Sequence, residues 1–176
     1  MPGVTVAEEG NKRRGVMSPD EVRQCVMDIQ GWFRRHGATD ITGATSVDFQ
    51  RLSKGVDAPI PDNLEILLGE INGGIWFMDK KALTAEEIME TASSCESSGK
   101  WKRGLVPFAG EADGMLVIDT KTDEVVEWDE DDGLGDVVSS TFEDYLENFR
   151  NVIVAGKCEF DSDIGVIESV AGGSRK

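Results

Sequence analysis

Apolar residues recur every three or four positions in four stretches of the chain, which predicts four amphipathic helices. They cover approximately residues 18–36, 61–71, 84–95 and 141–155. Ser18 and Glu21 have the spacing of a capping box, and so do Thr84 and Glu87. Each helix carries one apolar stripe, so each needs a surface to pack on.

Strand signals begin where the second helix stops at two glycines. The apolar run 75–78 predicts a buried strand, and four more strand signals follow about every ten residues between Leu105 and Ser140. Residues 38–60 carry little pattern and predict a connection with one short helical turn. We therefore expect an α+β fold, with a small, mostly antiparallel sheet of about five to six strands and three to four helices packed on it.

The length of 176 residues, 39% of them apolar, predicts a single domain. We expect a flexible arm at 1–17, the folded domain at 18–155 and a tail at 156–176, which can add a strand to its own sheet or to a partner's edge. The N-terminus has no apolar segment typical of a secretory signal, and no stretch is apolar enough to predict a membrane span.

Charge is distributed unevenly along the chain. Residues 1–60 contain eight acids and eight bases, so the whole net charge of −16 comes from residues 61–176. Within 105–147 there are fourteen acids and one base, Lys121. Such a density repels phosphate and anionic lipid, which argues against nucleic acid and membranes as ligands and favours a protein partner with a basic surface. A solvated acidic face that only maintains solubility is the alternative.

The residues of common catalytic and metal sites are sparse. His36 is the only histidine, and the three cysteines (25, 95 and 158) are far apart, which argues against a zinc site. No phosphate-binding glycine loop is present. The acidic run that begins at Asp129 lacks the glutamate that an EF-hand requires at its twelfth position, which is Ser140. We expect no catalytic residue, metal or cofactor, and we expect reduced thiols in a cytoplasmic, reducing compartment.

The candidate binding residues are tryptophans and acids that fall in or beside the predicted strands. Aromatic rings next to carboxylates can receive the side chains of a basic partner. Trp76 and Trp128 also fit a position in the core, whereas Trp101, between two lysines, better fits an exposed contact. The predicted protein-binding residues are Trp76, Trp101, Glu111, Asp113, Glu127, Trp128, Asp129, Glu130, Asp131 and Asp132.

The order of these signals resembles the SUKH superfamily, the domain of the fungal cell-wall-assembly and killer-toxin-resistance regulator and of many bacterial immunity proteins. Three matches carry the resemblance, which spans about residues 18–152. They are Ile60-Pro61-Asp62 entering a helix that ends in Asn72-Gly73-Gly74; Val106–Gly110 followed by Met115–Asp119; and Val125–Asp129 followed by Ser139–Leu146, which opens the last helix.

The resemblance implies a sheet with helices on one side and a binding module without catalytic residues. We therefore expect an adaptor or structural subunit of a hetero-complex that binds a basic partner surface. One alternative is an immunity-type inhibitor of a toxin or nuclease, whose acidic face mimics a nucleic-acid backbone. A second is a subunit of a cytoskeletal or axonemal assembly, and an enzyme of unfamiliar type is a third.

Overall fold

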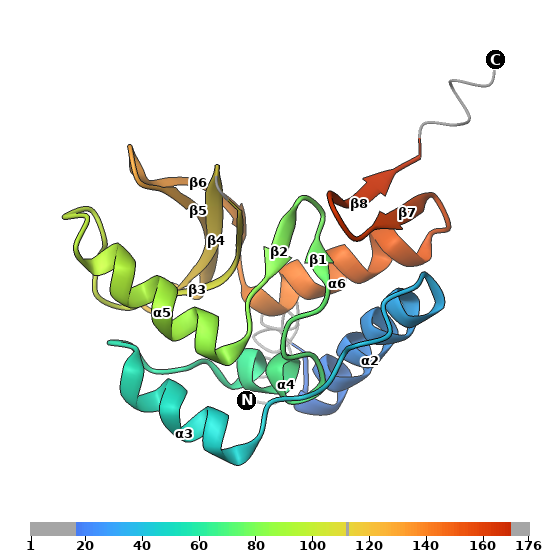
Figure 1. The fold of residues 1–176 in the computed structure, drawn as a ribbon, viewed down its shortest axis with the longest axis horizontal. Helices are drawn as coiled ribbons and strands as arrows, with labels where there is room; N and C mark the ends of the chain where they lie inside the picture. The colour runs from blue at the N-terminus through green and yellow to red at the C-terminus, as the bar shows by residue number, and fades with distance from the viewer. Residues whose placement is uncertain (1–16, 112, 170–176) are drawn as a thin grey trace, which may run out of the picture.

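The computed structural model describes residues 17–111 and 113–169, and it is α+β as expected (Figure 1). The helices of this part of the chain are α2 (Pro19–Arg35), α3 (Ser46–Gly55), α4 (Asp62–Glu70), α5 (Ala85–Glu96) and α6 (Phe142–Val154). The strands are β1 (Trp76–Phe77), β2 (Lys80–Ala82), β3 (Leu105–Glu111), β4 (Gly114–Asp119), β5 (Glu124–Asp129), β6 (Gly133–Ser139), β7 (Cys158–Asp161) and β8 (Gly165–Glu168). The predicted arm at 1–17 lies outside the described residues except for Met17.

The helix starts follow the capping chemistry of the sequence. Both predicted capping boxes form: the Ser18 hydroxyl accepts from the Glu21 N–H, and the Thr84 hydroxyl accepts from the Glu87 N–H. The prediction that residues 38–60 are a connection with one helical turn was wrong, because α3 is a ten-residue helix in this region. A third capping box, between Thr45 and Asp48, starts it.

Six strands form one antiparallel sheet in the order β1-β2-β3-β4-β5-β6, so each strand pairs with its neighbours in sequence. This confirms the meander predicted between Leu105 and Ser140. The apolar run 75–78 turns back as a hairpin, since Met78 adopts a positive φ of 56° and leads into β2, which the sequence had not indicated. Lys121 lies in the tight turn between β4 and β5.

The main core lies between one face of the sheet and the helices α2, α4 and α6, and α5 contributes Ala85, Ile88 and Ala92 to it. The apolar stripe predicted on α2 is fully buried, and Phe33 on that helix stacks with Phe149 of α6 at 6.3 Å between ring centroids. From the sheet, alternate residues of β3 and β4 such as Val106 and Ile118 point into this core. A network of aromatic contacts around Phe108 joins the sheet to α6.

A smaller core covers the other face of the sheet, and the C-terminal end of α5 takes part in it. The resemblance had implied helices on one side of the sheet only, and the end of α5 departs from that. Figure 1 shows α5 across the sheet from α6. The C-terminal end of α5 supplies Cys95, and the strands supply the alternate residues that do not face the main core. This second core consists of Cys95, Leu105, Met115, Val117, Val126 and Trp128, with Trp101 and Leu134 packed against it.

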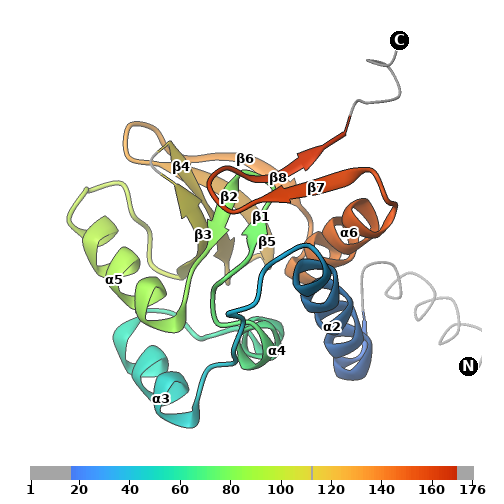
Figure 2. The same ribbon diagram turned by 45° about the vertical axis from the view of Figure 1, so that its right-hand side comes forward.

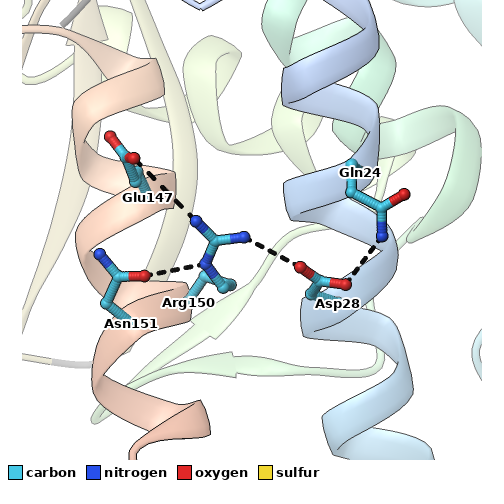
Figure 3. A network of polar contacts seen from close by, with 5 residues as sticks. All are labelled: Gln24, Asp28, Glu147, Arg150 and Asn151. Atoms are coloured by element: carbon cyan, nitrogen blue, oxygen red, sulfur yellow. Dashed lines mark hydrogen bonds and ion pairs between the residues drawn. The ribbon is translucent and has the colours of Figure 1, made fainter.

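Helices α2 and α6 are also joined by a polar network (Figure 3). The guanidinium of Arg150 on α6 donates to Asp28 on α2 at 2.9 Å, and Gln24 donates to the other oxygen of Asp28. Asn151 and Glu147 hold Arg150 from its own helix. Because Arg150 and Asp28 are partly buried, this contact fixes how the two helices align.

The region of the predicted tail contains a two-stranded hairpin, β7–β8, that is separate from the main sheet (Figure 2). It reaches the sheet at β1, where the Val166 N–H donates to the Met78 carbonyl at 2.9 Å. The approach is so close that a Cβ on Gly165 would lie 2.2 Å from the Met78 oxygen. The hairpin therefore lies against the edge of the sheet that β1 forms.

We predict that Gly43→Ala destabilises the fold by about 2–3 kcal/mol, because a Cβ at this position would lie 1.9 Å from the Gly69 carbonyl oxygen. Backbone hydrogen bonds from Ala44 to Leu68 and from Asn72 to Thr42 prevent the two segments from separating. The control is Gly69→Ala, whose Cβ meets no atom within 4 Å and which should stabilise α4 by about 0.5 kcal/mol. Urea unfolding measures both, and equal effects would contradict the close approach.

Candidate functional site

Two acidic turns meet at one end of the sheet. In an antiparallel meander, alternate turns lie at the same end, so the β3–β4 turn and the β5–β6 turn are neighbours. The strand register confirms this arrangement, since Glu111 pairs with Gly114, Met115 pairs with Trp128, and Asp129 pairs with Gly133. The β4–β5 turn with Lys121 lies at the opposite end. The single base of the segment 105–147 is thereby separated from most of its acids.

Between these turns and the end of α5 lies a hollow of about 600 Å³, which we call the acidic groove. It is lined by Cys95, Glu111, Asp113, Gly114, Met115, Trp128, Asp129, Glu130 and Asp131. Five of these nine residues are acids, and none of the nine is basic. Four of the acids have no ion pair among the described residues, so no direct contact there neutralises their charge.

The floor of the acidic groove is apolar and belongs to the second core. Trp128 is 3% exposed and contacts Trp101 edge to face, with 5.2 Å between the ring centroids. Its indole Nε1 is buried and has no hydrogen-bond acceptor among the described residues. An unsatisfied buried donor costs about 1–3 kcal/mol, so the ring is held there by packing alone.

Among the described residues, Asp113 is the one groove acid with an ion-pair partner. Lys80 donates to its carboxylate at 2.9 Å. This hydrogen bond holds the pKa of Asp113 below its usual range. Burial lowers the pKa of Lys80, but the bond to Asp113 and the charges of Asp79 and Glu127 outweigh it, so the pKa of Lys80 is raised. Lys80 therefore stays charged and fixes one wall of the groove.

The longer acidic turn is shaped by its own backbone contacts. The Asp132 N–H donates to Asp129 Oδ1 at 2.7 Å, which closes the turn. Lys100, from the loop after α5, donates to the Asp131 carbonyl oxygen. The carboxylates of Glu130 and Asp131 remain exposed, so they can reach a bound molecule.

The structure brings six of the ten predicted binding residues into the acidic groove. Trp101 lies just behind it, half-buried against Trp128. Asp132 is exposed in the same turn, whereas Glu127 lines a second, smaller hollow of about 150 Å³ together with Lys80. Trp76 lies elsewhere, in the main core beneath the β7–β8 hairpin.

Sequence reasoning missed three residues that shape this site. Cys95 and Met115 complete the groove floor, and Lys80 anchors Asp113. Met115 could have been found from strand alternation, because it shares a face and a register position with Trp128. The other two residues come from α5 and β2, and no local signal connects them to the acidic turns.

Other ligand classes find little support in this part of the chain. Within residues 17–111 and 113–169, no three His, Cys, Asp or Glu side chains are arranged to hold a metal ion. His36 stacks on Trp32 and contacts its carbonyl at a helix end, far from the acids. Among the described residues, no helix has the length and apolarity to cross a membrane.

Comparison with protein families places this fold in a known group. The family model of the SMI1 / KNR4 family (SUKH-1) matches residues 43–148, and the chain belongs to this family. The matched segment runs from just before α3 into the first half of α6 and includes the whole acidic groove. A search of curated proteins gave no significant match. Helix α2 and the β7–β8 hairpin lie outside the matched segment, although both pack on its core.

We predict that Cys95 reacts slowly with iodoacetamide although it lines the groove. Burial raises the pKa of its thiol to about 11, and the charge of Glu130 adds to this, so little thiolate exists at pH 8. The matched control is Ser93→Cys, an exposed position on the same helix. We expect alkylation of Cys95 to be about a hundred-fold slower than at position 93. Comparable rates would mean that the groove floor opens.

Proposed function

We propose that this chain is a non-enzymatic protein-interaction module that binds a basic partner surface through the acidic groove. Membership in the SMI1 / KNR4 family is compatible with an interaction module and with an immunity-type protein. The observation that carries the proposal is a groove with five carboxylates and an apolar floor, and with no basic residue among the nine that line it. Its role is that of an adaptor or structural subunit in a larger complex, in a reducing compartment.

A lysine or arginine side chain fits this arrangement. Its methylene stem can cover Met115 and Trp128, while its cationic group remains near Glu130 and Asp131 on the rim. The unsatisfied Trp128 N–H favours a peptide over a free cation. The N–H is buried, so a partner carbonyl can accept from it only if the groove opens on binding, and a cation offers no acceptor.

The charge distribution supports a partner protein over nucleic acid or membrane. Four unpaired carboxylates repel phosphate, whereas they accelerate the approach of a basic surface and make the complex sensitive to salt. Tubulin tails are acidic, so a cytoskeletal version of this function requires contact through another surface or another subunit.

The test is affinity capture from a native extract with two charge-reversed variants. Glu111→Lys combined with Glu130→Lys reverses opposite walls of the groove and spares Asp129, which shapes the turn. We expect this variant to lose the partner that the wild type retains, and we expect binding of the wild type to fall about ten-fold between 50 and 500 mM salt. Mass spectrometry of the captured proteins is the measurement.

The matched control reverses the same amount of charge away from the groove, by Glu90→Lys combined with Glu159→Lys, both exposed. Retention by the control and loss by the groove variant support the proposal. Equal retention by all three proteins, or binding that does not change with salt, contradicts it. A single captured nuclease or toxin that loses its activity in the complex would support the inhibitor alternative instead.

A further inference from the structure

The two edge strands of the six-stranded sheet, β1 and β6, have different neighbours. At the β1 edge, the β7–β8 hairpin lies against the sheet, and its Val166 N–H donates to the Met78 carbonyl. At the opposite edge, β6 is the last strand, and in the described part of the chain it pairs with β5 alone (Figure 1). Among residues 17–111 and 113–169, no backbone hydrogen bond outside the sheet involves residues 133–139. The outward N–H and C=O groups of β6 therefore form an open pairing edge within the described structure.

The side chains of β6 are also exposed. The exposed fractions of Val137 and Val138 are 54% and 42%, so two consecutive β-branched apolar residues of an edge strand are exposed. Val138 also lines an apolar hollow of about 200 Å³. It is lined by Met78, Val138, Ser139, Tyr145, Asn148, Phe149 and Val152. An extended segment on β6 could place one apolar side chain in this hollow.

We propose that β6 accepts an extended, basic segment of a partner protein as a seventh strand of the sheet. The open backbone groups select an extended chain, because only such a chain can satisfy them in register. The charge selects a basic chain: between Lys121 and Arg150 the sequence contains eleven acids and no lysine or arginine. Asp136, at the middle of β6, is exposed and would face a lysine or arginine on the added strand.

The same Asp136 disfavours a second copy of this chain as the occupant. Residues 133–139 have position 136 at their centre, so two β6 strands that pair antiparallel over their whole length place the two Asp136 carboxylates directly opposite each other. Like charges at such a position are destabilising. The net charge of −16 on each copy adds to the repulsion.

This surface is independent of the acidic groove, since it uses backbone groups and apolar side chains of β6. The two surfaces are nevertheless continuous, because β6 begins directly after the acidic turn. A single partner could thus insert basic side chains in the groove and pair its backbone with β6.

The test uses hydrogen–deuterium exchange of the full chain with a defined probe. The probe is an acetylated and amidated octapeptide that alternates valine and lysine. The control probe has the same side chains but carries an N-methyl group on every residue, which removes its backbone donors. We expect the unmethylated peptide to slow amide exchange in residues 134–139 by about five-fold or more, and the methylated peptide to have no effect there.

Two variants distinguish peptide binding at β6 from peptide binding in the acidic groove. Asp136→Lys should weaken peptide binding about five-fold while the far-ultraviolet circular dichroism stays unchanged, because Asp136 is exposed. Glu111→Lys changes the groove but not β6, and it should leave the protection of residues 134–139 intact. The inference then stands even if the groove proposal fails.

Several results would overturn the inference. Equal protection by the methylated peptide would show that charge alone attracts the probe. Protection confined to residues 111–114 and 129–132 would place the peptide in the groove. If amide exchange in β6 is slow in the free protein and becomes faster when residues 170–176 are deleted, the chain's own terminus is the occupant of the edge. A dimer in light scattering would identify a second copy as the occupant.

Discussion

The antiparallel register of β3 to β6 is the constraint on which the rest of this molecule depends. Alternate residues of these strands point into two different cores, so Ile118 lies in the main core while Met115 and Val117 lie in the second core with Cys95. A shift of one residue would exchange every buried side chain between the faces. The same register places the two acidic turns beside each other and moves Lys121 to the far end, which creates the charge asymmetry of the groove.

Much of this fold could be predicted from local patterns, because capping boxes, apolar stripes and turn residues act over short distances. Helix α3 was missed because only Leu52 of that helix is fully buried, which leaves a thin stripe, and because Asp48 takes the place of the usual glutamate in its capping box. An apolar stripe also does not say which sheet face it meets, so the position of α5 could not be predicted. Trp76 was grouped with the groove by residue type, although its strand lies under the hairpin.

Two surfaces of different chemistry lie next to each other at the β6 side of the sheet. The acidic groove offers unpaired carboxylates above an apolar floor, and the edge of β6 offers unpaired backbone groups beside exposed valines. Both select a basic partner, the first through side chains and the second through an extended backbone. The chain covers the opposite edge with its own hairpin, so open binding capacity is concentrated on the acidic side.

The most direct test of the central claim is the set of four indole N–H signals in ¹⁵N-labelled full-length protein, recorded with and without the partner captured from native extract. Binding in the groove predicts that the signal of Trp128 moves downfield as its Nε1 gains an acceptor, that Trp101 behind it shifts as well, and that Trp32 and Trp76 stay in place. A stationary Trp128 signal with a saturating partner would contradict the account.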